Sequence, residues 1–129
     1  MKVFLGGTCN DSTWRNKIIS MLDIDFFNPV VDDWTEDCMI EEVKQRKECD
    51  LCLYCITPLM TGVYSIAEAI DDSNKKPSST IIIILRDDEN CRFTDGQWKS
   101  ISQVAKMAES NGARVFNCLK IAANYINNL

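Results

Sequence analysis

The chain has 129 residues, a length that fits one compact domain spanning residues 1–129 with a hydrophobic core of its own. Hydrophobic residues make up 46% and charged residues 26%, which is typical of soluble globular proteins. The formal net charge is -5 and no basic run alternates with aromatic residues, so a nucleic acid polymer is not an expected partner. A free nucleoside or nucleotide stays compatible, because a small ligand needs only local hydrogen-bond donors.

The sequence shows neither a targeting pattern nor a membrane-spanning pattern. The N-terminus begins directly with a short strand pattern and lacks the charged and apolar regions of a signal peptide. The unbroken apolar run from Ile81 to Leu85 is far shorter than the ~20 residues that a spanning helix requires. We therefore expect a cytoplasmic protein with no membrane partner.

Seven cysteines include a C-x-x-C-x-x-C pattern at Cys49, Cys52 and Cys55. The segment from Asp50 to Ile56 is typical of a strand, in which residues three apart point to opposite faces. The chain has no histidine and no second C-x-x-C pair to complete a zinc site. We interpret the cysteines as free thiols that act as small apolar core residues, and we predict no metal site and no cofactor.

Strand and helix patterns alternate five times along the chain. In chain order, the predicted elements are a strand over residues 2–5, a helix over 13–22 capped by Asp11 or Ser12, a strand over 25–27, a helix over 36–48, a strand over 50–56, a helix over 61–73, a strand over 80–85, a polar loop over 86–96, a helix over 97–110, a strand over 114–117 and a helix that ends near Leu129. This alternation predicts an α/β protein, a flavodoxin-like three-layer sandwich with a five-stranded parallel sheet in the order 2-1-3-4-5.

In such sheets, ligands bind beyond the carboxyl ends of the strands, where the order switches between the first strand and the third. Gly6, Gly7, Thr8 and Asn10 belong to the loop that follows the first strand at this switch point. Two glycines let a ligand approach the backbone, and the helix that follows offers unpaired N–H groups. The alternative is a tight turn with no part in binding, and the sequence does not decide between the two.

Carboxylates must do the chemistry if the protein is an enzyme, because the chain has no histidine, no G-x-S-x-G elbow and no Walker-type loop. In a half-buried cleft, one carboxylate can attack a sugar carbon while a second handles the proton of the leaving group. Asp50 opens the third predicted strand, and Glu68 lies in the helix over residues 61–73. The alternative, that each is an exposed charge, fits Glu68 less well because its neighbours in Y-S-I-A-E-A-I are largely apolar.

Five stretches carry a recognisable combination: VFLGGTCN…WR, FFNPVVDDW, CDLCLYCITP, TGVYSIAEAIDDSNKKP and TIIIIL. Together they resemble the nucleoside 2-deoxyribosyltransferase-like proteins from the N-terminus to about Leu85. The resemblance implies a flavodoxin-like fold and cleavage of the N-glycosidic bond of a deoxynucleoside or its 5′-monophosphate. The sugar then passes to another base or to water. It also implies a homo-oligomer in which a neighbour completes the cleft.

The resemblance further implies roles for individual residues. Glu68 would form the covalent glycosyl intermediate, and Asp50 would help with the base. Thr61, Gly62 and Ser65 would face the 5′ end of the sugar, at a helix N-terminus suited to a hydroxyl or a phosphate.

The segment after the second strand would hold the base. Asp32, Asp33 and Trp34 would form this base-binding loop, and Trp34 would either stack on the base or cover the core as a rim residue. Trp14 is expected to pack between helix and sheet. Arg15 would reach a phosphate or be a solvated helix residue, and we favour the second interpretation.

Two departures from the family pattern keep other functions open. Phe4 stands where family members have a tyrosine that orients the nucleophile, and phenylalanine cannot donate a hydrogen bond. Members also have glycine two residues before the glutamate, where this chain has Ile66. Both departures favour a catalytically silent nucleotide-binding module, whereas the presence of both Asp50 and Glu68 favours the enzyme. A third reading is an N-glycosidase that acts on a ribonucleotide or an NAD-like compound.

Overall fold

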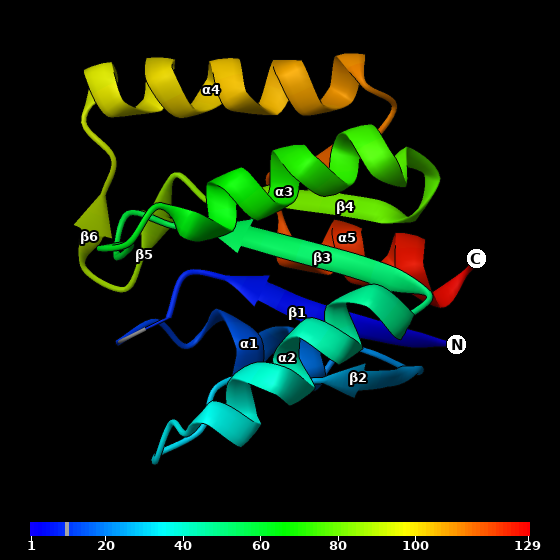
Figure 1. Ribbon diagram of the computed structural model, residues 1–129. Coiled ribbons are helices and arrows are strands. Elements are labelled where there is room, and N and C mark those ends of the chain that lie inside the picture. The colour runs from blue at the N-terminus through cyan, green and yellow to red at the C-terminus, as the bar shows by residue number, and fades with distance from the viewer. Residues whose placement is uncertain (10) are drawn as a thin grey trace.

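A parallel five-stranded sheet forms the centre of the molecule, with helices on both faces (Figure 1). The computed structural model describes residues 1–9 and 11–129, so Asn10 lies outside the described residues. The strands of this sheet are β1 (Lys2–Gly7), β2 (Asp25–Phe27), β3 (Leu51–Ile56), β4 (Thr80–Ile84) and β7 (Arg114–Phe116), in the order β2-β1-β3-β4-β7. Because β7 is the fifth of these strands along the chain, the predicted flavodoxin-like order 2-1-3-4-5 is confirmed.

The helices follow the predicted alternation. They are α1 (Trp14–Ile19), α2 (Glu36–Glu48), α3 (Tyr64–Lys75), α4 (Asp95–Ser110) and α5 (Leu119–Asn127), with a short 3-10 turn, η1 (Pro77–Ser79), before β4. The segment predicted as a polar loop contains a two-stranded antiparallel hairpin, β5 (Asp87–Asp88) and β6 (Cys91–Arg92). Strands of two residues are too short to leave a hydrophobic period in the sequence, which explains why this hairpin was not predicted.

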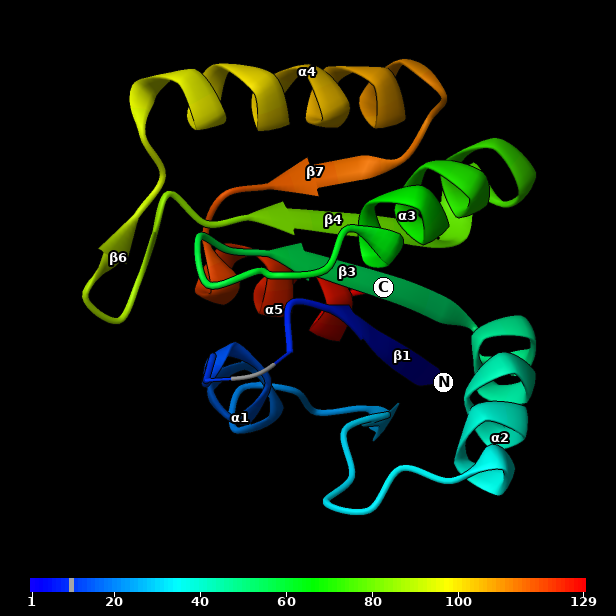
Figure 2. The same cartoon turned by 60° about the vertical axis from the view of Figure 1, so that its left-hand side comes forward.

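The two faces of the sheet carry separate hydrophobic cores, because successive strand residues point in opposite directions. Helices α1 and α5 cover one face through Trp14, Ile18 and the alanines of α5. Helices α3 and α4 cover the other face (Figure 2). Trp14 is 1% exposed, which confirms its predicted place between helix and sheet. Cys52 and Cys55 fall in different cores, as the strand pattern predicts.

Strand β1 runs two residues further than predicted, through Gly6 and Gly7, which pair with Tyr54 and Cys55 of β3. Gly7 has φ +117°, and a Cβ added there would lie 2.1 Å from the carbonyl oxygen of Cys55. A Cβ added at Gly6 would lie 2.7 Å from the ring of Tyr54. The expectation that the loop begins at Gly6 was therefore wrong, since both glycines let β1 pack closely on β3.

Gly7→Ala is expected to destabilise the fold by about 2–4 kcal/mol, because the new methyl group meets backbone atoms and the backbone conformation disfavours alanine. Urea unfolding followed by circular dichroism measures the loss. Gly96→Ala is the matched control: Gly96 lies in α4, and nothing lies within 4 Å of an added Cβ. Its midpoint should be unchanged or slightly higher. Equal midpoints for the two variants would contradict the packing argument.

Candidate active site

A cleft of about 570 Å³ opens at the carboxyl end of β1. Its walls come from the end of β1, the segment after β2, helix α2 and the start of α3. The volume falls within the range of roughly 300–1,000 Å³ that is usual for small-molecule sites. The cleft lies where the strand order switches between β1 and β3, which is the place that the predicted topology indicates for a ligand.

Most of the predicted site residues line this cleft. They are Gly6, Gly7, Thr8, Trp34, Thr61, Gly62, Ser65 and Glu68. Trp34 is 60% exposed, so its ring stands at the rim and does not cover the core. Thr8 is buried, and its hydroxyl oxygen accepts a hydrogen bond from the backbone N–H of Thr57 at 3.0 Å. This bond fixes the loop after β1 to the end of β3.

The structure does not bring Asp50 to the cleft. Asp50 immediately precedes β3 at the amino-terminal edge of the sheet, where its carboxylate accepts a hydrogen bond from the backbone N–H of Lys2 at 2.8 Å. Glu68 lines the cleft at the opposite edge. The expected meeting of these two acids in the cleft was wrong, because Asp50 is bound to the start of β1 and does not line the cleft. Asp32 and Asp33 are exposed and do not line the cleft either.

Arg15 lies under the loop after β1 and lines the cleft. Its Nε donates to the carbonyl of Leu5 at 3.1 Å, Nη1 to Thr8 at 2.5 Å and Nη2 to Gly7 at 3.2 Å. The side chain of Trp14 also donates to the Thr8 carbonyl, at 2.7 Å. The interpretation of Arg15 as a solvated residue was wrong, because it is only 6% exposed. Burial lowers the pKa of the Arg15 guanidinium.

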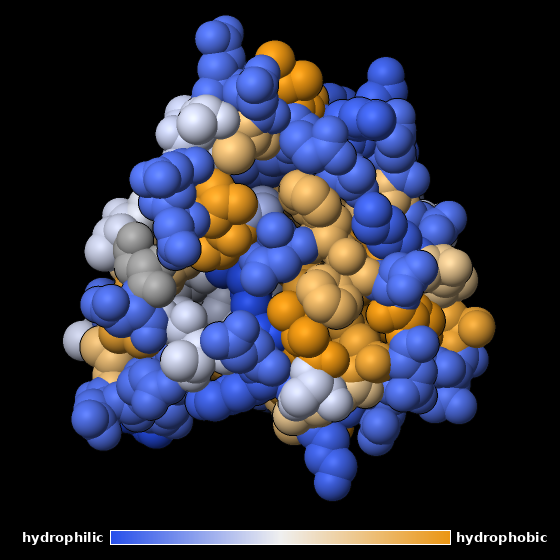
Figure 3. All heavy atoms as spheres, turned by 90° about the horizontal axis from the view of Figure 1, so that it is seen from below, coloured by the Kyte–Doolittle hydropathy of each residue, from blue (hydrophilic) through white to orange (hydrophobic). Residues whose placement is uncertain are grey.

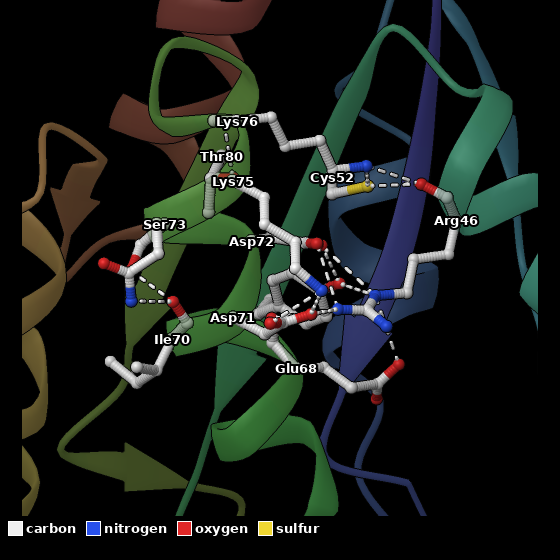
Figure 4. A network of polar contacts seen from close by, with 12 residues as sticks. Arg46, Cys52, Glu68, Ile70, Asp71, Asp72, Ser73, Lys75, Lys76 and Thr80 are labelled. Atoms are coloured by element: carbon white, nitrogen blue, oxygen red, sulfur yellow. Dashed lines mark hydrogen bonds and ion pairs between the residues drawn. The ribbon is translucent and has the colours of Figure 1, made fainter.

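Glu68 projects from α3 into the cleft with its side chain 13% exposed. Its Oε2 lies 3.6 Å from Nε of Arg46 (Figure 4). Burial raises the pKa of the Glu68 carboxyl, the Arg46 guanidinium lowers it, and the charges of Glu42 and Asp72 raise it further. The net effect is upward, so Glu68 takes up a proton at a higher pH than an exposed glutamate does.

Glu42 is a second carboxyl in the cleft, and the sequence reasoning missed it. Glu42 and Arg46 are four residues apart in α2 and so lie on one face of that helix. This spacing was a usable signal, but it did not show which face turns toward the cleft. Helix α2 lies at the surface of the protein: none of its residues is buried, and the side chain of Ile40 is 59% exposed. Figure 3 shows the underside of the molecule, where apolar residues lie beside a hydrophilic hollow.

The β5–β6 hairpin holds the start of α1. The Ser12 hydroxyl donates to the carboxylate of Asp88 at 2.5 Å, and the Thr13 hydroxyl donates to Glu89 at 2.6 Å. Helix α1 begins after Thr13, whose side chain makes no N-cap bond. Of the two expected caps, Ser12 accepts a long hydrogen bond from the backbone N–H of Trp14, at 3.4 Å. The hairpin thus holds the same segment that this local bond holds.

The cleft residues all lie within a region that matches a known family. The model of the family described as nucleoside 2-deoxyribosyltransferase like matches residues 1–87, which include β1 to β4. The chain belongs to this family. No curated protein and no solved structure gives a significant match.

Two other features are absent from the part of the chain that the structure describes. Across residues 1–9 and 11–129, no helix is long and apolar enough to cross a membrane. The same residues contain no cluster of three or more histidine, cysteine, aspartate or glutamate side chains that could hold a metal ion.

Arg15→Met is expected to lower the free energy of unfolding by about 2–4 kcal/mol, because the carbonyls of Leu5, Gly7 and Thr8 each lose a hydrogen bond from the buried guanidinium. Arg15→Lys should recover only a small part of the lost stability, since an ammonium group cannot reproduce the planar set of donors of the guanidinium. Lys17→Met, at an exposed position of the same helix, is the control and should change little. Chemical unfolding of the three variants tests this, and equal stability of Arg15→Met and Lys17→Met would contradict it.

Proposed function

We propose that the protein cleaves the N-glycosidic bond of a deoxynucleoside or its 5′-monophosphate in this cleft. Membership of the family supports glycosyl-transfer chemistry. The observation that carries the proposal is the Glu68 carboxyl, which is largely buried, lines the cleft and shares it with a second carboxyl from Glu42. Glycosyl transfer with retention uses one carboxylate as nucleophile and a second carboxyl for proton transfer.

In the proposed reaction, the Glu68 carboxylate attacks C1′ of the sugar. The C1′–N bond breaks, its electron pair leaves with the base, and Glu42 gives a proton to that base. A water molecule or a second base then attacks C1′, the bond to Glu68 breaks, and Glu42 takes back a proton from the attacking group. We assign to Glu42 the proton transfer expected of Asp50, because Asp50 lies at the other edge of the sheet.

Other lining residues suit the remaining parts of a nucleoside. Trp34 presents an exposed ring at the rim, on which a base can stack with a gain of ~1–3 kcal/mol. Thr61 and Gly62 lie just before α3 and Ser65 lies in its first turn, and a 5′-hydroxyl or phosphate is favoured at this helix N-terminus.

One observation favours a second candidate, a nucleotide-binding module without catalytic activity. Phe4 is buried and packs on the rings of Phe27 and Tyr54, with centroids 6.0 and 6.3 Å away, so it offers no hydrogen bond to Glu68. Ligand binding without release of base would identify this module. The homo-oligomer, the cytoplasmic location and the binding roles of the exposed loop residues stay predictions, and light scattering tests the first of them.

Glu68→Gln is expected to reduce base release by about 1,000-fold or more, because the amide keeps the shape of the side chain but cannot act as nucleophile. Glu42→Gln should cost about 100-fold or more through the lost proton transfer. Glu109→Gln, at an exposed position of α4, is the control and should keep full activity.

Liquid chromatography of reactions with a panel of substrates measures the released base. The panel contains deoxynucleosides, their 5′-monophosphates, a ribonucleotide and NAD, each with and without a free acceptor base. Full activity of Glu68→Gln would remove this residue from the mechanism.

The rate of base release is expected to fall toward acid pH around a value above the ordinary pKa of glutamate. Only the charged form of Glu68 attacks C1′, and burial raises the pKa of this carboxyl. As the pH decreases through that raised pKa, the nucleophile becomes protonated and activity is lost. A pH–rate profile of kcat measures the position of this acid limb. An acid limb at or below the ordinary glutamate value would contradict the assignment.

A further inference from the structure

We propose that Arg46 is the positioning residue for Glu68: Tyr54 and Asp72 hold its guanidinium group, and that group fixes the Glu68 carboxylate for attack. The inference rests on the proposed role of Glu68 as nucleophile. It deepens that role by naming what holds the nucleophile in place, since Phe4 offers it no hydrogen bond.

Arg46 contacts Glu68 at two points (Figure 4). Its Nε lies 3.6 Å from the carboxylate Oε2, and its Nη2 donates to the backbone carbonyl of Glu68 at 3.3 Å. The backbone hydrogen bond fixes the turn of α3. The side-chain contact is an ion pair that attracts the carboxylate toward the guanidinium, because the single hydrogen of Nε is donated to Tyr54 and Asp72. Arg46 itself does not line the cleft, so it acts on a ligand only through Glu68.

The guanidinium is held from behind by two buried groups. Nε donates to the hydroxyl oxygen of Tyr54 at 2.9 Å and to Asp72 at 3.2 Å, and Nη2 donates to Asp72 at 3.0 Å. The Tyr54 hydroxyl in turn donates to Asp72 at 2.5 Å. Tyr54 is 0% exposed and Asp72 is 4% exposed. Arg46 cannot swing away without leaving the charge of Asp72 buried and uncompensated.

The side chain of Tyr54 is closely packed, so its hydroxyl group holds Arg46 at a fixed position. Its ring lies against Gly6, where an added Cβ would come within 2.7 Å of it, and it packs on the ring of Phe4. Burial and the hydrogen bond to Asp72 raise the pKa of the Tyr54 hydroxyl, so the group stays protonated and continues to donate. The position of Arg46 therefore follows from the packing of β1 on β3.

Arg46 also affects the pKa of the Glu68 carboxyl. The charged groups that act on this carboxyl are Glu42 and Arg46 from α2 and Asp72 from α3. Burial, Glu42 and Asp72 all raise the pKa of Glu68, whereas Arg46 lowers it. Removal of Arg46 would extend the pH range in which Glu68 is protonated and cannot attack.

The test compares Arg46→Met, Arg46→Lys and a control, Asp71→Asn. Asp71 also pairs with Arg46, at 3.1 Å, but its side chain is 43% exposed and is shared with Lys75. Two readouts are used: the pKa of Glu68 from carbon-13 NMR of the labelled carboxyl, and the pH profile of kcat and KM. The NMR readout needs no turnover. If the protein releases no base, the proposed function is wrong, and the pKa of Glu68 in the variants still shows whether Arg46 acts on this carboxyl.

Arg46→Met is expected to raise the pKa of Glu68 by about 1 unit or more and to move the acid limb of kcat by the same amount. KM should stay within about twofold, because Arg46 does not line the cleft. Arg46→Lys keeps the charge but not the planar fork, so it should show a smaller pKa shift together with a reduced kcat. Asp71→Asn should leave both readouts unchanged. An unchanged pKa of Glu68 in Arg46→Met would overturn the proposal.

Tyr54→Phe tests the anchor and decides the question if Arg46→Met does not fold. The substitution keeps the ring that packs on Gly6 and removes only the hydroxyl. We expect an upward shift of the pKa of Glu68 and a loss of kcat of up to about 10-fold, because the hydroxyl that accepts from Arg46 and donates to Asp72 is gone. If the folded variant keeps the pKa of Glu68 and the acid limb of the native protein, Tyr54 does not hold Arg46 for this purpose and the proposal is wrong.

Discussion

At Gly6 and Gly7 the backbone of β1 runs so close to β3 that no Cβ fits between the two strands. This close approach sets the shape of the whole site. It leaves room for the ring of Tyr54 under Gly6, and it places the last carbonyls of β1 where Arg15 can bind them. The glycines thus act through the packing of the sheet, and the shape of the cleft is a consequence of that packing.

Two arginines stabilise residues that line the cleft, each in a different way. Arg15 binds backbone carbonyls, which carry no net charge, so it fixes the loop after β1 and keeps its own charge. Arg46 binds the carboxylate of the buried Asp72 and also acts on the carboxylate of Glu68. Both arginines use the same planar set of N–H donors, but Arg15 binds uncharged carbonyls whereas Arg46 binds charged carboxylates.

The elements that could be predicted from the sequence are those with strong local signals. Helix α2 was predicted with its observed bounds, because acidic residues open it and basic residues close it. The structure adds a cap, in which the Thr35 hydroxyl oxygen accepts a hydrogen bond from the N–H of Cys38. The strand order followed from the alternation of strands and helices. The cleft residues of β1 and α3 were also found, since the carboxyl ends of parallel strands meet at one edge of the sheet.

The features that could not be predicted depend on contacts between segments that lie far apart in the chain. The sequence gives the spacing of Asp50 and Glu68 but does not show that β3 begins after Asp50 and carries it to the other edge. Arg15 looked like a surface residue because its partners are backbone carbonyls, which leave no mark in a sequence. Glu42 shares a helix face with Arg46, but only the packing of α2 decides where that face points.

The family match ends at residue 87, and the two residues that follow, Asp88 and Glu89, hold the segment between β1 and α1. The loop after β1, which lines the cleft, is therefore held by residues that lie outside the part of the chain matched by the family model. A hairpin of another length or composition would reshape the entrance for ligands while leaving Glu68 and its supporting groups in place. The proposed ligand preference and the proposed chemical step of this protein thus depend on different segments of its chain.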